Sequence, residues 1–300
     1  MKASGNVKYH VMALIVALIW GTTLTSTKVL LNHGLSPAEI MIYRFVLAYV
    51  SLWIIHPKQP TGLSLRGELK FMLLGILGGS LYFLTENTAL KLTLASNVAL
   101  IVVTAPILTM FLSRLMLKTE PIGRYVWIGS FIALSGVALV VYNGNIILEL
   151  NPLGDILSIA AALSWAFYSV LLKRINNNYN VLFYTRKIFF YGIVTLIPWF
   201  FIPGNDINTS LLCDGEVILN LLFLGIVASS GCYVIWNMVI SRLGVVKTSN
   251  YIYLVPMVSL IFSVIFLNEP LTIHAITGSV LILAGVYIAA KIVKKNHIFV

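Results

Sequence analysis

One acidic residue, Glu86, lies deep inside the long apolar stretch 69–90 of this sequence. A charged side chain in hydrocarbon is costly, so an acid at such a position is by default a candidate functional group. Its carboxyl group can bind the ammonium group of a substrate or carry a coupling proton. The alternative is a structural ion pair with Arg44 or Lys91, which fall toward the same end of the apolar stretches.

Four basic residues stand near the ends of other apolar stretches. Arg44 and Lys28 lie toward one end of the predicted helices, and Arg186 and Lys173 lie toward the opposite end. A pair of cations at each mouth of a pathway would guide a carboxylate or close a gate, so we treat the four as gating candidates. The alternative interpretation is that these long side chains reach back to the lipid headgroups.

Aromatic and polar side chains in the middle of the apolar stretches are candidates for the wall of a binding cavity. Aromatic residues at helix ends are more often anchors at the membrane interface, and simple packing is the alternative for those in the middle. Together with Glu86, the predicted substrate-binding residues are Trp20, Thr23, Tyr82, Asn87, Trp165, Tyr168, Trp236 and Asn237.

Two prolines, Pro106 and Pro256, fall near the centres of two further apolar stretches. Proline has no backbone N–H, so each one leaves the carbonyl four residues earlier without its helical donor. Transmembrane helices tolerate this where neighbouring groups satisfy the freed carbonyl. The matched depths of the two prolines predict a pair of hinges, with a static kink as the alternative.

The elements that position these residues must be built in lipid, because the chain has too few charges to cover a water-exposed surface. Of its 300 residues, 59% are apolar and 10% are charged, against about 25% charged in a soluble domain. The mean hydropathy of +0.94 points the same way. This composition excludes a soluble enzyme, a nucleic-acid-binding protein and a secreted disulfide scaffold.

Ten apolar stretches are each long enough to cross a bilayer, which takes about 20 residues of helix. The runs are continuous, whereas the strands of a membrane β-barrel alternate over about 10 residues. We therefore predict an all-α polytopic integral membrane protein with ten transmembrane helices in contact with membrane lipid. The stretches cover residues 11–31, 38–56, 69–90, 95–117, 125–142, 153–172, 180–203, 217–238, 249–267 and 273–291.

The positive charges predict the orientation of the chain. With the N-terminus in the cytoplasm, seventeen of the twenty Lys and Arg residues fall on the cytoplasmic side, as the positive-inside rule requires. The net charge of +10 is therefore a topology signal and not the mark of a nucleic-acid partner. We expect an inner-membrane protein with both termini in the cytoplasm and with Cys213 on the outer side.

The chain repeats itself at an offset of 145 to 150 residues, which is the mark of an internal repeat. Each half, 1–146 and 147–300, then holds five predicted helices. Because five is odd, the second half must enter the membrane from the opposite face, and inverted repeats of this kind are the architecture of secondary transporters. The matched positions are Trp20 with Trp165, Lys28 with Lys173, Asn87 with Asn237, Pro106 with Pro256, and Glu120-Pro121 with Glu269-Pro270.

These features together resemble the EamA family of the drug/metabolite transporter superfamily. The resemblance rests on the five-plus-five helices, the Ala-x-x-Trp entry to each half, the mid-helix prolines, and Glu-Pro followed by Gly-x6-Gly in both halves. It covers essentially the whole chain, although neither acid has the glycine that usually precedes it in the family. The resemblance implies export of a small metabolite, often an amino acid or a derivative, through a central cavity.

We therefore predict a secondary-active exporter of a small metabolite that works by alternating access. No catalytic residue, metal or cofactor is predicted, because nucleotide- and metal-binding motifs are missing from the sequence. A coupling proton and a homodimer are both compatible with this prediction, since ladders of small residues such as Gly129-Ala133 and Gly285-Ala289 permit close helix contact. A passive channel or facilitator is the first rival, and a membrane-embedded lipid-modifying enzyme is the second.

Overall fold

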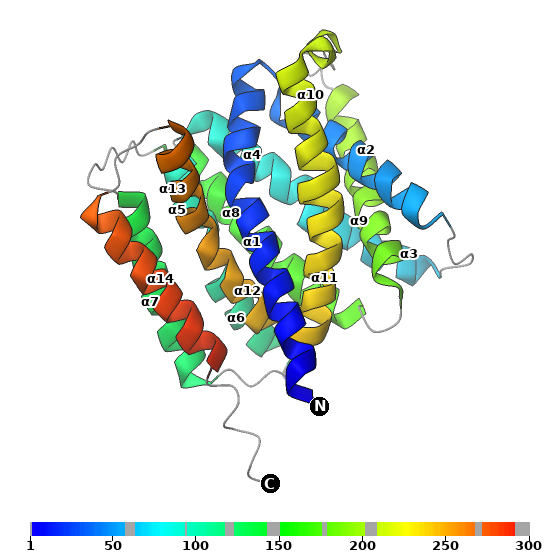
Figure 1. Cartoon of the computed structure of the whole chain (residues 1–300). Coiled ribbons are helices and arrows are strands. Elements are labelled where there is room, and N and C mark those ends of the chain that lie inside the picture. The colour runs from blue at the N-terminus through cyan, green and yellow to red at the C-terminus, as the bar shows by residue number, and fades with distance from the viewer. Residues whose placement is uncertain are drawn as a thin grey trace.

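The structure is a computed structural model that describes residues 2–57, 64–93, 95–117, 123–142, 151–175, 179–201, 209–267 and 272–291 (Figure 1). Within these ranges the chain is helical and has no strand, which confirms the all-α prediction. The same ranges hold nine helical spans long and apolar enough to cross a membrane, and the shorter helix Ile273–Ala289 is also apolar. The paired Glu-Pro motifs and the boundary between the two predicted halves lie outside the described residues.

The first half of the chain forms five spans. Its third span is interrupted by the π-helix η1 (Ile76–Ser80), and its fourth is divided at Val103 and Thr104. The α-helices of this half are α1 (Lys2–Asn32), α2 (Pro37–Ile55), α3 (Leu65–Gly75), α4 (Leu81–Leu92), α5 (Ala95–Val102), α6 (Ala105–Met116) and α7 (Arg124–Tyr142).

The second half also forms five spans, and its interruptions fall at corresponding places. Its third span contains the π-helix η4 (Phe223–Gly231), and its fourth contains the 3-10 helix η5 (Asn250–Tyr253). These matched interruptions support the predicted repeat. The other elements are α8 (Pro152–Ile175), α9 (Val181–Leu196), η2 (Ile197–Phe201), η3 (Ser210–Cys213), α10 (Gly215–Leu222), α11 (Cys232–Leu243), α12 (Val245–Ser249), α13 (Leu254–Leu267) and α14 (Ile273–Lys291).

Small residues account for the two π-helices. The segment η1 reads Ile-Leu-Gly-Gly-Ser, and η4 contains Gly225, Ala228, two serines and Gly231. Glycine has a weak preference for the α-helix. At these glycines the π-helical turn therefore replaces an α-helical turn that was already less favourable. Segments of π-helix are frequent at functional sites. We predicted the stretches 69–90 and 217–238 as uninterrupted helices, because a π-turn leaves the apolar pattern of a sequence almost unchanged.

The two prolines lie in the first turns of helices, each directly after a break in its span. Pro106 is the second residue of α6, directly after the break at Val103 and Thr104. Pro256 is the third residue of α13, directly after η5. Proline is tolerated in the first turn of a helix because the N–H that it lacks would have no helical partner there. Each break therefore lies just before a proline, at a helix start where the missing backbone N–H costs no helical hydrogen bond.

The main helix contacts join one half of the chain to the other. Helix α1 packs against α11 and α13, and its counterpart α8 packs against α4 and α6. Helices α7 and α14 lie side by side at one edge of the bundle (Figure 1). The described parts of the two halves are therefore interleaved and do not form separate lobes.

Glycine brings α7 and α14 into backbone contact. A Cβ atom at Gly129 would lie 2.5 Å from the carbonyl oxygen of Gly285, and one at Gly136 would lie 2.5 Å from that of Gly278. The predicted ladders of small residues therefore pack within one chain, at the junction of its two halves. Two further ladders at the same spacing, Ala13-Ala17-Gly21 and Gly75-Gly79, are also buried, since Gly21 lies against Val258 and Gly75 against Tyr191. These four ladders are buried within the chain.

Two of the gating candidates cap helix ends. Lys28 Nζ donates to the Leu90 carbonyl over 3.0 Å, in the last turn of α4. Lys173 Nζ donates to the Ser241 carbonyl over 3.0 Å, in the last turn of α11. A cation is favourable at a helix C-terminus because the last carbonyls are unpaired and the helix dipole is negative there. The two lysines thus fasten corresponding helix pairs in the two halves.

We expect Gly129→Ala to lower the stability of the protein. The added methyl group would meet backbone atoms of α14, which cannot move aside as a side chain can, and overpacking of this kind typically costs about 1–3 kcal/mol. Thermal unfolding in detergent measures the change. The matched control is Gly215→Ala, because nothing lies within 4 Å of a Cβ atom at that position. Equal melting temperatures for the two variants would contradict the close helix contact.

We expect Lys28→Met and Lys173→Met each to lower the free energy of unfolding by roughly 0.3–2 kcal/mol, the range for a cation at a helix C-terminus. Methionine keeps most of the length of the lysine and removes its charge and donors. Lys91→Met, at an exposed lysine, is the control. If the two lysines act as gates and not as caps, the melting temperature will stay unchanged while the rate of transport falls.

Candidate substrate cavity

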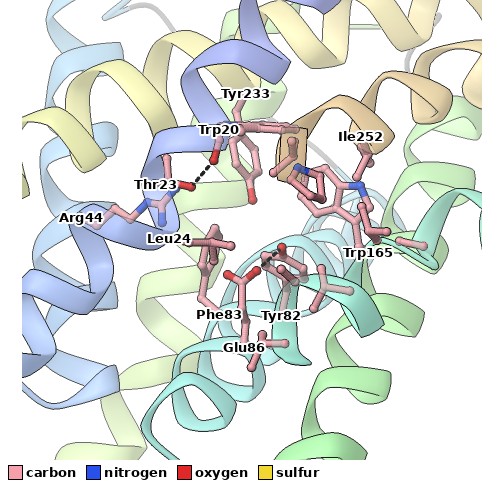
Figure 2. A pocket seen from close by; sticks show the side chains of 17 residues that line it. Trp20, Thr23, Leu24, Arg44, Tyr82, Phe83, Glu86, Trp165, Tyr233 and Ile252 are labelled. Atoms are coloured by element: carbon pink, nitrogen blue, oxygen red, sulfur yellow. Dashed lines mark hydrogen bonds between the residues drawn. The ribbon is translucent and has the colours of Figure 1, made fainter. Parts of the chain in front are cut away.

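A cavity lies where spans of the two halves meet (Figure 2). It contains about 720 Å³ of space that protein atoms do not fill, including the open space at its mouth. Its wall comes from α1, α2, α4, α5, α6, α8, α11, η5 and α13. The cavity therefore depends on both halves of the chain.

Seven of the residues predicted from the sequence line this cavity. They come from five spans that are far apart in the sequence, and they include the one acid and one of the arginines. The seven are Trp20, Thr23, Arg44, Tyr82, Glu86, Trp165 and Pro256.

Glu86 is held by a neutral partner. The Tyr82 hydroxyl, one helical turn earlier on α4, donates to Glu86 Oε1 over 2.7 Å, and Figure 2 shows this bond beside the open space. Only 8% of the Glu86 side chain surface is exposed. An ion pair of Glu86 with Arg44 or Lys91 was the predicted alternative to a role in substrate or proton binding. Among the ion pairs that the described residues form, none involves Glu86.

Arg44 is also held by uncharged groups. Its Nε donates to the Ser229 hydroxyl of η4, and its guanidinium carbon lies 4.3 Å from the centre of the Phe83 ring. Cation–π contact with an aromatic face is favourable for arginine. Arg44 and Glu86 therefore line the same buried cavity, and their guanidinium and carboxyl groups form no ion pair with each other. A ligand that carries both charges can engage both groups.

Aromatic rings form much of the remaining wall. Trp165 lies at the centre of this group, with ring centres 5.4 Å from Trp20, 5.2 Å from Tyr82 and 5.7 Å from Tyr233. Trp20 Nε1 donates to the Ala228 carbonyl over 3.0 Å. Such a wall can hold an apolar side chain of a ligand, and its ring faces can attract an ammonium group.

Four predicted binding residues lie outside the cavity lining and support it from behind. The Tyr168 hydroxyl donates to Asn237 Oδ1 over 2.8 Å, and Asn237 Nδ2 donates to Thr185 Oγ1 over 2.9 Å. Asn87 Nδ2 donates to the Pro37 carbonyl over 3.4 Å. The fourth, Trp236, has its ring centre 4.9 Å from that of Trp20.

The other gating and hinge candidates are not among the residues that line the cavity. Lys28 and Lys173 cap helices, as described above. Arg186 donates to the His56 carbonyl at the end of α2, and together with Lys187 it lines a separate small pocket of about 260 Å³ between α2 and α9. Pro106 is buried beside Ala105, which does line the cavity. The described residues contain no group of three or more His, Cys, Asp or Glu side chains that could hold a metal ion.

Sequence reasoning missed the apolar part of the wall, because it searched for side chains with chemistry. The internal repeat would have revealed part of it: an offset of 150 relates Phe83 to Tyr233 and Val102 to Ile252, and all four line the cavity. The missed residues are Leu24, Phe83, Val98, Ala99, Val102, Val103, Ala105, Tyr233, Ile252 and Val255.

Comparison with known proteins identifies the family. An uncharacterized transporter of Archaeoglobus fulgidus is 28% identical over 97% of this chain and 99% of its own. A probable amino-acid metabolite efflux pump of Escherichia coli K12 is 27% identical over 94% of each chain. One solved crystal structure covers 95% of this chain and 98% of its own with a TM-score of 0.75, and at 18% identity the two share a fold.

The family model described as the EamA-like transporter family matches residues 7–142 and, a second time, residues 152–290. The predicted resemblance is thereby confirmed. The long apolar helices and these matches identify an integral membrane transporter of a small molecule, and not an enzyme. Because the model matches nearly the whole chain, this protein belongs to the EamA-like transporter family.

Proposed function

We propose that this protein is a secondary-active exporter of a small zwitterionic metabolite, such as an amino acid or a derivative, and that it works by alternating access. It resides in the inner membrane with both termini in the cytoplasm. The positive-inside count supports this orientation. In the fold, α1 begins and α14 ends at the same face of the bundle (Figure 1).

The observation that carries the proposal is that a carboxyl group and a guanidinium group line one buried cavity without forming an ion pair with each other. Arg44 offers a guanidinium group to a carboxylate, and Glu86 offers a carboxylate to an ammonium group. The aromatic rings between them accept the apolar remainder of the ligand. A zwitterion satisfies both charges at once, whereas an apolar ligand would leave both without a charged partner in low dielectric.

The interrupted spans support alternating access. The breaks before Pro106 and Pro256 and the π-helices η1 and η4 occur at corresponding places in the two halves. Irregular backbone at the depth of the cavity is a feature of secondary transporters, whose halves rock about a central site. In this proposal the two prolines mark the hinges.

Glu86 is the proposed site of a coupling proton. The ionisable groups that face it are Tyr82 and Tyr233 and, across the cavity, Arg44. A carboxyl group that alternately binds a proton and a substrate ammonium couples the inward flow of one to the outward flow of the other. A passive facilitator of the same fold would not need this acid.

We expect Glu86→Gln to abolish transport driven by a pH gradient, because glutamine keeps the shape of the side chain but cannot take up a proton. Purified protein in proteoliposomes is tested with the radiolabelled proteinogenic amino acids, first by counterflow and then under an imposed pH gradient. Loss of a charge-assisted contact predicts at least about a tenfold fall in rate.

The control for this experiment is Glu216→Gln, the same chemical change at an exposed acid that pairs with His33 outside the cavity. A Glu86→Gln protein that keeps counterflow but loses the response to the gradient identifies the coupling group. Loss of both activities identifies a binding group. Unchanged activity in both assays removes Glu86 from the mechanism, and a wild-type protein that moves none of the amino acids refutes the proposed substrate class.

We expect Cys213 to react with a membrane-impermeant thiol reagent in intact cells, because it is exposed before α10 on the predicted outer side. Cys232 is buried and provides the internal comparison, while Cys213→Ser should remove the signal. Labelling that appears only after lysis would reverse the proposed orientation.

A further inference from the structure

Two backbone carbonyls in the π-helices accept hydrogen bonds from cavity side chains of the opposite half. Trp20 Nε1, in the first half, donates to the Ala228 carbonyl of η4 over 3.0 Å. The Tyr233 hydroxyl, in the second half, donates to the Gly78 carbonyl of η1 over 2.8 Å. Gly78 and Ala228 are 150 positions apart, which is the offset of the internal repeat. The two acceptors are therefore equivalent positions, each bound from across the junction.

The donors are not equivalent. Trp165 is the repeat counterpart of Trp20, but its side chain is 95% buried and its Nε1 has no hydrogen-bond partner among the described residues. An unpaired N–H in a dry interior is unfavourable. By the repeat, the acceptor expected for Trp165 is the Gly78 carbonyl, the counterpart of the Ala228 carbonyl. The Gly78 carbonyl accepts from the Tyr233 hydroxyl instead.

The neighbours of Trp165 on α8 contact the segment that carries this carbonyl. The adjacent residue Ser164 donates to the Leu77 carbonyl over 2.7 Å. One turn later on α8, the ring of Tyr168 lies directly against Gly78. The ring centres of Trp165 and Tyr233 are 5.7 Å apart. Movement of η1 against α8 would therefore change which of the two donors lies nearer to the Gly78 carbonyl.

We infer that the Trp20–Ala228 and Trp165–Gly78 pairs are the latches of two alternate states. In the state described here, Trp20 holds η4 and Trp165 is released. In the opposite-facing state Trp165 donates to the Gly78 carbonyl, Tyr233 is displaced into the cavity and Trp20 is released. This inference rests on the proposed alternating access. One indole stays bonded in each state, while the Tyr233 bond is present only in the state described here and favours it.

The test uses a reporter thiol that becomes accessible only in the second state. Ser249 is the repeat counterpart of the cavity residue Ala99 and is 1% exposed. Ser249→Cys is introduced into a chain in which both native cysteines are replaced by serine. The rate of its labelling by N-ethylmaleimide in proteoliposomes then follows the population of the second state.

Trp20→Phe and Trp165→Phe remove the N–H and keep an aromatic ring. We expect Trp20→Phe to raise the labelling rate about fivefold and Trp165→Phe to lower it about fivefold, the population change for a hydrogen bond worth ~1 kcal/mol. The double variant should return to within about twofold of the parent, because each state then loses one bond. Trp53→Phe, at a tryptophan of α2 that is 50% exposed, is the control, and it should change the rate by less than about twofold.

A second reporter, Ala99→Cys, distinguishes a shift between states from unfolding. Unfolding raises labelling at both positions, whereas a shift toward the second state raises it at position 249 alone. Changes of the same sign in the two single variants, or no change in either, overturn the inference. If amino-acid counterflow by the parent protein persists in that case, the proposed function stands without the latch. If the parent shows no counterflow with any of the amino acids, the proposed function itself fails.

Discussion

A bilayer interior contains no water to solvate a charge, and the cavity of this protein is organised around that constraint. Glu86 and Arg44 are both buried, and each is held by groups that carry no charge: the Tyr82 hydroxyl for the acid, and the Ser229 hydroxyl with the Phe83 ring for the base. A direct ion pair would have been a simpler way to offset the cost of burial. It would also have left neither charge free for a ligand. The neutral partners keep both charges in position and available.

The same absence of water governs the backbone. Irregular helix in lipid is tolerated only where other groups satisfy the freed carbonyls or where it borders a cavity. The first condition holds at the π-helices. The carbonyls of Leu77 and Gly78 in η1 accept from Ser164 and Tyr233, and that of Ala228 in η4 accepts from Trp20. Trp20 and Tyr233 therefore do two tasks, since they line the cavity and they satisfy backbone carbonyls of the π-helices.

Sequence reasoning recovered the elements that depend on composition and periodicity: the helical spans and the family. It also found the acid, one arginine and four aromatic or hydroxyl side chains of the cavity wall, because such residues are rare inside apolar stretches. It did not find the breaks, since a division at Val103 or at η5 leaves the apolar run intact. Nor did it foresee that Lys28 and Lys173 cap helices, because that role depends on which helix end lies nearby. Asn237 and Tyr168 were expected at the cavity for their chemistry, and they bond to each other behind its wall.

The contact between α7 and α14 limits where the molecule can move. Glycines on both helices bring their backbones together, so that even a methyl group at Gly129 would meet the carbonyl of Gly285. Backbone surfaces this close cannot slide past each other without a clash, so the pair is a fixed junction between the halves. In the proposed alternating access, movement falls to the other spans, and four of these contain irregular backbone: Leu65–Leu92, Val98–Met116, Gly215–Leu243 and Val245–Phe262. Pro106 and Pro256 begin the rigid helices that follow each break. Proline cannot donate to the turn before it, so each proline leaves a backbone carbonyl of its break without a helical donor, and this is the physical basis for proposing the pair as hinges.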